Sequence, residues 1–176
     1  MVIFVRETTI NKKVYDWLAD FYDTDTRNIT SLLDCQIATT YLLIWPVMEQ
    51  NLFSGFMKQD KIAETAARYA AHYSEMKIEE DVKYFYDRYQ DRRLYRNLKH
   101  GAYYTEIDEI LRKNYNTITS VEKLQLMIFV VYRYRNNIFH GSKGIDSWLQ
   151  FSDQIEKCIS FMMKIVDCHE KYYVVQ

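Results

Sequence analysis

The sequence contains few residues that interrupt helices. Its 176 residues include only four glycines and one proline. Because turns and loops draw heavily on these two residue types, their scarcity favours long helices joined by short connections. Hydrophobic residues form 48% of the chain and charged residues 27%. That balance is typical of a folded protein and excludes an intrinsically disordered one.

Cysteine is also scarce. Cys35, Cys158 and Cys168 are an odd number of cysteines at wide spacing, which argues against a disulfide framework. The pattern indicates buried, reduced thiols in a cytoplasmic protein. Outside the stretch 132–143, no histidine has a second His or Cys at the spacing of metal ligands. We therefore expect neither a metal site nor a cofactor.

The chain lacks both a strong net charge and a long apolar run. Its formal net charge is −1 at pH 7, so any contact with nucleic acid must come from a local basic patch. The apolar stretches 2–5 and 126–132 are too short for a signal-peptide core or a membrane span. We expect no membrane partner.

Apolar residues recur at helical spacing along most of the chain. This periodicity predicts helices over residues 10–22, 29–56, 58–73, 81–100, 101–114 and 120–140, and a last helix from residue 146 or 147. The second of these is apolar on nearly all sides and is our predicted central core helix, kinked or split at Pro46. We predict an all-α fold, a single-domain bundle spanning residues 1–176, with about six mostly antiparallel helices.

Sixteen tyrosines are present, which is many for this length. A tyrosine can pack its ring in a core while its hydroxyl meets polar groups at the boundary. An interface or a base-stacking surface is the alternative interpretation. We favour the core edge, because the tyrosines are spread through the whole chain.

Residues 132–143 read YRYRNNIFHGSK and combine side chains that can carry out chemistry. Arg135 offers a planar fork that suits a phosphate, and His140 can exchange a proton near neutral pH. Together they can cleave a ribose phosphodiester without a metal, with Asn136 orienting them. Arg135 and His140 lie about 140° apart on an ideal helix, so a distorted helix end or two paired chains must bring them together. The alternative is a basic helix end that Gly141 merely caps.

The string RNNIFHG at 135–141 resembles the motif of the HEPN superfamily, an arginine and a histidine separated by four to six residues. HEPN stands for higher eukaryotes and prokaryotes nucleotide-binding domains. Asn136 supplies the polar residue directly after the arginine. Residues 41–53, YLLIWPVMEQNLF, also resemble the long early helix of such domains, with Trp45 and Glu49 in plausible places.

The resemblance implies a metal-independent endoribonuclease that acts as a homodimer, with two motifs meeting in a cleft between the copies. Its products would carry a 2′,3′-cyclic phosphate. Members serve as toxins, in phage defence or in RNA processing, and some members are inactive. The alternative is therefore a non-catalytic module that binds a nucleotide, RNA or a protein partner such as an antitoxin or a nucleotidyltransferase.

Carried over to this chain, the resemblance assigns Arg135 to the scissile phosphate and His140 to the 2′-hydroxyl or the leaving oxygen. Asn136 would orient both. The predicted RNA contacts are Lys143, Arg133 and Asn137. Glu49 would pair with Arg135 if the two helices cross there, although a solvated or structural carboxylate is the favoured interpretation.

A second candidate RNA-binding surface lies within residues 84–99. Its cationic side chains are Arg88, Arg92, Arg93, Arg96 and Lys99, and the interleaved aromatic residues are Tyr84, Tyr86, Tyr89 and Tyr95. Such a run can follow an RNA backbone and stack on bases. The alternative is a solvated helix face neutralised by the carboxylates of Glu79, Glu80, Asp81, Asp87 and Asp91. We favour this alternative, because the acids are so close in the sequence.

Overall fold

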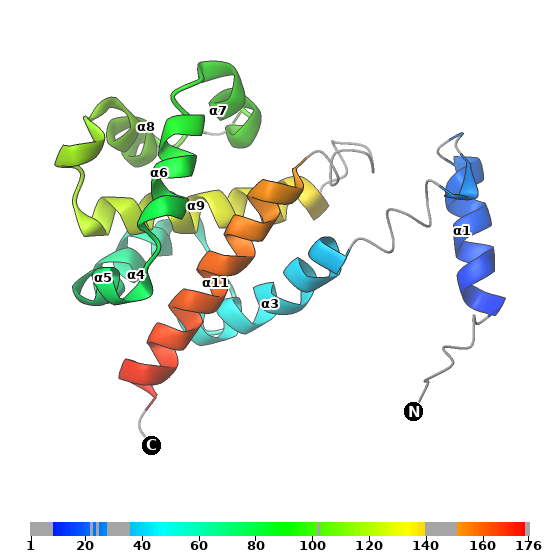
Figure 1. Cartoon of the computed structure of the whole chain (residues 1–176), viewed down its shortest axis with the longest axis horizontal. Coiled ribbons are helices and arrows are strands. Elements are labelled where there is room, and N and C mark those ends of the chain that lie inside the picture. The colour runs from blue at the N-terminus through cyan, green and yellow to red at the C-terminus, as the bar shows by residue number, and fades with distance from the viewer. Residues whose placement is uncertain are drawn as a thin grey trace.

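The computed structural model describes residues 9–21, 23, 25–27, 36–101, 103–139 and 151–174. These residues form helices and their connections, with no strand among them, which confirms the all-α prediction. The helices are α1 (Thr9–Phe21), α3 (Gln36–Phe53), α4 (Ile62–Tyr69), α5 (Tyr73–Met76), α6 (Glu79–Arg88), α7 (Arg92–Lys99), α8 (Thr105–Arg112), α9 (Ser120–Phe139) and α11 (Ser152–Tyr173) (Figure 1). Short 3-10 turns occupy Gln59–Lys61, Ala70–His72 and Tyr115–Thr117.

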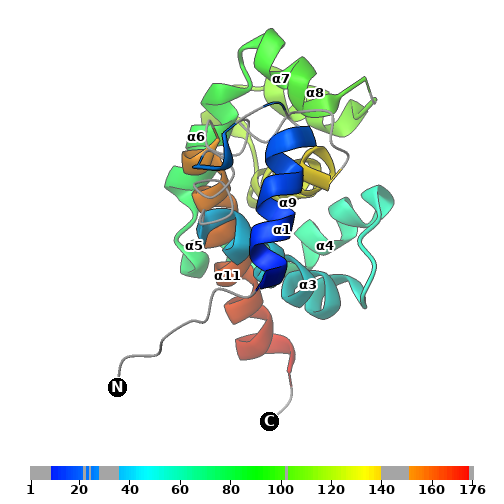
Figure 2. The same cartoon turned by 90° about the vertical axis from the view of Figure 1, so that its right-hand side faces the viewer.

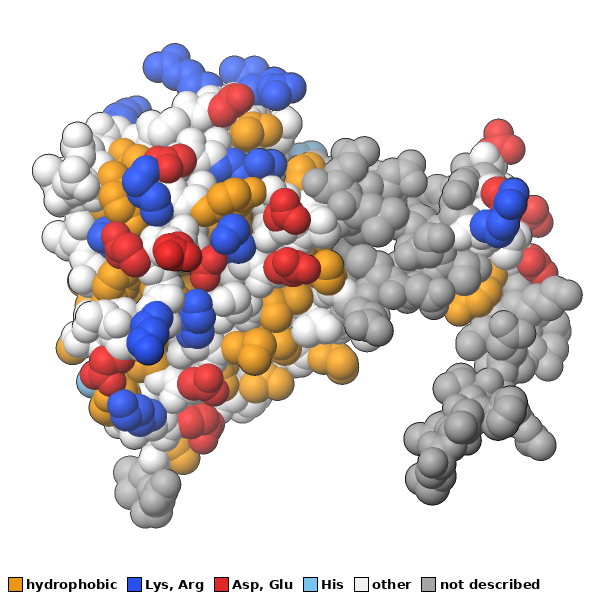
Figure 3. Space-filling view, viewed as in Figure 1, with side chains coloured by type: hydrophobic (Ala, Val, Ile, Leu, Met, Phe, Trp, Pro, Cys, Tyr) orange, Lys and Arg blue, Asp and Glu red, His pale blue; other side chains and the backbone are white. Residues whose placement is uncertain are grey.

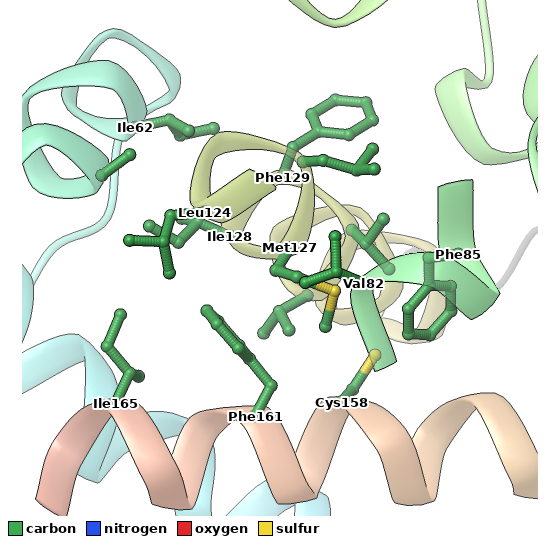
Figure 4. Close-up of a cluster of buried hydrophobic side chains, with 14 of the residues drawn as sticks. Ile62, Val82, Phe85, Leu124, Met127, Ile128, Phe129, Cys158, Phe161 and Ile165 are labelled. Atoms are coloured by element: carbon green, nitrogen blue, oxygen red, sulfur yellow. The ribbon is translucent and has the colours of Figure 1, made fainter. Parts of the chain in front are cut away.

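The central helix of the core is α9. Every residue from 126 to 131 is fully buried, because α9 packs against α4, α6, α7, α8 and α11. Figure 4 shows Met127 of α9 beside Val82 of α6, with Phe161 of α11 pointing toward α9 and Phe129 on the side of α9 away from α11. A helix that is apolar on all sides is expected at such a central position.

The prediction that the core helix would be the early one, now α3, is wrong. α3 packs along α11 and buries only one face, while Leu43 on another face is 68% exposed. Pro46 lies inside α3 and does not split it, since the helix runs from Gln36 to Phe53. The expected start of this helix, residues 29–35, lies outside the described residues.

Residues 81–100 form two helices, α6 and α7, and this split positions the basic side chains of the segment. Asp91 is the N-cap of α7, and its carboxylate accepts hydrogen bonds from the backbone N–H groups of Arg93 (2.7 Å) and Leu94 (3.2 Å). A carboxylate that binds free N–H groups favours the start of a new helix. α7 ends before His100, which has the left-handed conformation with φ 48°.

Tyrosines line the edge of the core, as the sequence suggested. Tyr41 is fully buried and its hydroxyl donates to the carbonyl of Val131 (2.8 Å). Tyr95 is 9% exposed and donates to Asp108 Oδ1 (2.6 Å). The rings therefore contribute apolar burial, while their hydroxyls satisfy polar groups between helices.

α1 confirms the helix predicted for residues 10–22, but its apolar stripe is open to solvent. Val14, Trp17 and Phe21 are 44%, 61% and 66% exposed. The rings of Trp17 and Phe21 stack with centroids 5.3 Å apart. Figure 1 shows α1 at one end of the longest axis of the structure, and Figure 2 looks onto α1 from that end.

Across the part of the chain that the structure describes, no helix combines the length and apolar character of a membrane span. Cys158 and Cys168 are buried free thiols, as predicted, and Cys35 lies outside the described residues.

Candidate functional site

The last turns of α9 carry the described part of the RNNIFHG string. The side chains of Arg135, Asn136 and Asn137 are described, whereas His140 and Lys143 lie outside the described residues. The geometry of Arg135 relative to His140 therefore stays a prediction. The described residues show how α9 and its neighbours hold the arginine.

Arg135 is half-buried and lies against α3. Its Cζ atom is 5.7 Å from the ring centroid of Trp45. A guanidinium over an indole face is attracted by the negative face of the ring, and the contact limits the rotamers of the arginine. Trp45, which is 4% exposed, is therefore the platform on which Arg135 is positioned.

Trp45 is itself oriented by Glu49, one turn further along α3. The indole Nε1–H of Trp45 donates to Glu49 Oε2 (3.0 Å), and the backbone N–H of Met57 donates to Glu49 Oε1 (3.0 Å). Both carboxylate oxygens thus serve structural partners, which agrees with the favoured interpretation of Glu49. Glu49 is linked to Arg135 through the Trp45 ring.

Tyr41 attaches α3 to α9 close to this platform. Its hydroxyl donates to the carbonyl oxygen of Val131, one turn before Arg135 (2.8 Å). Burial raises the pKa of Tyr41 well above its usual value, so the hydroxyl stays a neutral donor. This hydrogen bond holds the helix that carries Trp45 against the helix that carries Arg135.

Asn136 is 9% exposed, and its Oδ1 accepts a hydrogen bond from Arg135 Nη1 (3.1 Å). The amide therefore contacts the guanidinium directly, as an orienting residue must. The stack on Trp45 and the bond to Asn136 act on the same guanidinium from two helices. Such preorganisation reduces the entropy lost when the arginine binds an anion.

Arg133 occupies a different face of α9 and anchors α7. It is 9% exposed, with Nε donating to the carbonyl of Leu98 (3.0 Å), Nη2 to the carbonyl of Lys99 (3.1 Å) and Nη1 to the hydroxyl of Tyr104 (3.0 Å). The carbonyls at a helix C-terminus lack partners within the helix, so a buried guanidinium that binds them fixes the end of α7.

Asn137 belongs to the same anchor. Its Nδ2 donates to the carbonyl of Leu98 (3.3 Å), and its Oδ1 accepts from Arg133 Nη2 (3.3 Å). The structure thus places Arg133 and Asn137, two of the three predicted RNA contacts, between α9 and α7. Their predicted contact with RNA is not tested by this position.

The histidines outside the motif contact aromatic residues or lie at the surface. His169 Nδ1 is 2.7 Å from the hydroxyl of Tyr69, and the ring of His72 stacks on Tyr172. His100 is exposed at the end of α7. Among the described residues, no group of three or more His, Cys, Asp or Glu side chains is arranged to hold a metal ion.

The sequence does not reveal the positioning roles of Trp45 and Tyr41. Their helical spacing indicates only a core face, whereas the contact of Trp45 with Arg135 and the hydrogen bond of Tyr41 to Val131 join segments that are distant in the chain. The chain matches no family model, no curated protein and no solved structure.

Proposed function

We propose that this protein is a metal-independent endoribonuclease of the HEPN type, a single helical domain that acts as a homodimer. The observation that carries the proposal is the preorganised guanidinium of Arg135, held by Trp45 and Asn136 five residues before His140. An arginine fixed in this way suits a phosphate better than a flexible surface arginine does. The motif resemblance supplies the reaction.

In the proposed reaction, neutral His140 accepts the proton of a ribose 2′-hydroxyl, and the 2′-oxygen attacks the adjacent phosphorus. The bond from phosphorus to the 5′-oxygen of the next nucleotide breaks, and that oxygen takes up the proton from the imidazolium formed at His140. The products are a 2′,3′-cyclic phosphate and a free 5′-hydroxyl. Arg135 binds the non-bridging oxygens and stabilises the charge that builds on them.

The spacing of the motif supports the proposed homodimer. Arg135 and His140 are about 140° apart on an ideal helix, so one copy's arginine facing the other copy's histidine gives a composite site. Asn136 keeps Arg135 oriented, and Lys143 is a further phosphate contact in this proposal. In a cell, an antitoxin or another regulatory protein would restrain such an activity.

The test is cleavage of single-stranded RNA by the purified protein in the presence of EDTA. We expect cleavage with cyclic-phosphate ends, and loss of cleavage in Arg135→Ala and His140→Ala. The matched controls are Arg112→Ala and His100→Asn, which change exposed residues outside the site. Activity that EDTA abolishes, or that survives in both site variants, would count against the proposal.

A non-catalytic binding module is the second candidate. It is favoured by the anchoring role of Arg133 and Asn137, because part of the motif region then serves the fold alone. Expression in growing cells separates the two candidates. Toxicity of the wild type that disappears in His140→Ala supports the nuclease, whereas partner binding by pure protein without any RNA cleavage supports the module.

A further inference from the structure

One face of α7 is strongly basic. Arg92, Arg93 and Arg96 are exposed, while Tyr95 and Leu98 on the opposite side are 9% and 4% exposed. Figure 3 shows Lys and Arg side chains gathered at the top of the view, where α7 lies. The whole chain has a net charge of −1, so this is a local concentration of positive charge.

Three of the carboxylates expected to neutralise this face pair with lysines instead. Asp87 pairs with Lys83, and Glu79 pairs with Lys123. Asp81 is 8% exposed between α6 and α11, where it pairs with lysines of α11.

The remaining two acids, Asp91 and Glu80, also form no salt bridge with the arginines of α7 in the ranges that the structure describes. The carboxylate of Asp91 is used by the N-terminal N–H groups of α7. Glu80 is exposed and forms no ion pair among the described residues. In the described part of the chain, the side chains of Arg88, Arg92, Arg93 and Arg96 have no ion-pair or hydrogen-bond partner. Asp91 lies close enough to Arg93 and Arg88 for their charges to help lower its pKa, but no described carboxylate holds the arginines of α7 in a salt bridge.

Arg88, at the end of α6, also has an unsatisfied donor. Its Nε atom is buried and has no hydrogen-bond acceptor among the described residues. A buried N–H of a charged group is costly to leave without an acceptor.

The basic face is held next to the candidate site. Arg133 and Asn137 bind the last carbonyls of α7, and both lie within two residues of Arg135 on α9. α7 is therefore fixed to the turns of α9 that carry Arg135 and Asn136, on a different face of the helix. Arg135 itself lies on the other side of α9, against Trp45 of α3, so the basic face is a binding surface separate from this arginine.

The aromatic residue available for stacking differs from those predicted. Tyr86, Tyr89 and Tyr95 are buried in the core, and half-buried Tyr84 bonds to Gln154. Tyr103 follows the end of α7 and is 89% exposed. An aromatic ring so open to solvent at the end of a basic helix offers a flat face to a nucleobase.

We infer that the exposed arginines of α7 bind the phosphate backbone of single-stranded RNA and that Tyr103 stacks on one of its bases. The inference deepens the proposed function, on which the identity of the ligand rests. Arginine forks bind phosphates bidentately and an aromatic face accepts any base, so binding is expected to depend strongly on salt and weakly on sequence.

The test measures binding without cleavage. A fluorescent single-stranded RNA carrying 2′-O-methyl groups cannot undergo attack by the 2′-oxygen, so its anisotropy reports affinity alone. We expect Arg92→Gln/Arg96→Gln to reduce the slope of log K against log salt by about 1.4, because two phosphate contacts are lost. The matched control, Lys58→Gln/Lys77→Gln, removes the same charge from exposed positions elsewhere and should leave the slope unchanged.

Tyr103 is tested separately. Tyr103→Ala should weaken binding roughly five- to hundredfold, whereas Tyr103→Phe keeps the stacking face and should bind like the wild type. A purely structural role for this exposed residue would not produce this contrast.

The outcomes separate this inference from the proposed function. If plain RNA is cleaved in EDTA while the α7 variants bind like the wild type, the α7 inference is overturned and the nuclease stands. If the α7 variants lose binding but no RNA is ever cleaved, the binding surface stands and the nuclease fails. Absence of RNA binding by the wild type, or equal losses in the lysine control, also overturns the inference.

Discussion

The guanidinium of Arg135 lies over the indole ring of Trp45, with Arg135 Cζ 5.7 Å from the ring centroid. Arg135 belongs to α9 and Trp45 to α3, so the contact depends on how these helices pack. Tyr41 joins the two helices through the carbonyl of Val131, and Glu49 orients the indole ring within α3.

Replacing Trp45 should disorder the side chain of Arg135. In Trp45→Leu the guanidinium loses the ring face, and the cleavage rate of the proposed nuclease should fall roughly 2- to 30-fold. Trp45→Phe keeps an aromatic face and should lose less. The Nε–H resonance of Arg135 in an NMR spectrum is the independent readout, because the indole ring shifts it. An unchanged resonance in Trp45→Leu would contradict the stack.

Loss of one carboxylate oxygen at Glu49 should destabilise the fold. Glu49→Gln places an NH2 group where an acceptor is needed, so either the indole N–H of Trp45 or the backbone N–H of Met57 is left unpaired. We expect the free energy of unfolding to fall by about 1 to 3 kcal/mol, measured by urea denaturation. Glu109→Gln, at an exposed position, should change it little. Equal free energies of unfolding for Glu49→Gln and Glu109→Gln would argue against the structural role of Glu49.

Arg133→Lys should loosen α7. A lysine ammonium cannot reach the acceptors on Leu98, Lys99 and Tyr104 together, since they are bound by separate nitrogens of one planar fork. We expect a loss of about 2 to 4 kcal/mol in the free energy of unfolding, with faster hydrogen exchange in α7. Arg112→Lys is the exposed control and should leave exchange in α7 unchanged.

Stability should fall in acid through Asp108. Burial acts to raise the pKa of Asp108, but hydrogen bonds from Tyr95 and Lys99 outweigh it and hold the pKa below its usual value of 3.8. A carboxyl with a lowered folded-state pKa stabilises the fold above the unfolded pKa, and this stabilisation is lost as pH falls through the folded pKa. The melting temperature of the wild type should therefore exceed that of Asp108→Asn at pH 7, and the difference should shrink below about pH 4. A difference that is constant with pH would contradict this role.

Much of the architecture could be predicted because helix formation has a local signature. The apolar period places α1 and α9 within one or two residues of their observed ends. The predictions that failed concern how the helices pack against one another. α3 and α9 are both strongly apolar, and only the packing shows that α9 is enclosed while α3 keeps Leu43 open to solvent.

The partners of charged groups were the least predictable feature. Asp91 and Asp87 are close in the sequence to the arginines of α7, yet Asp91 caps a helix and Asp87 pairs with Lys83. Charge proximity along the chain does not determine pairing, because helix direction and burial decide which groups meet. The same reason explains why Arg133 holds α7. It also explains why Tyr103 is open to solvent whereas Tyr95 is buried.

The sequence by itself determined the helical class and the candidate chemistry, since period and residue type are properties of the chain read locally. The tertiary structure alone decided that Arg135 rests on Trp45, that Asn136 binds it, and that the exposed arginines of α7 form no salt bridge among the described residues. These relations join helices far apart in the chain. They arise from burying apolar faces together, which brings polar groups into contact that no local pattern pairs.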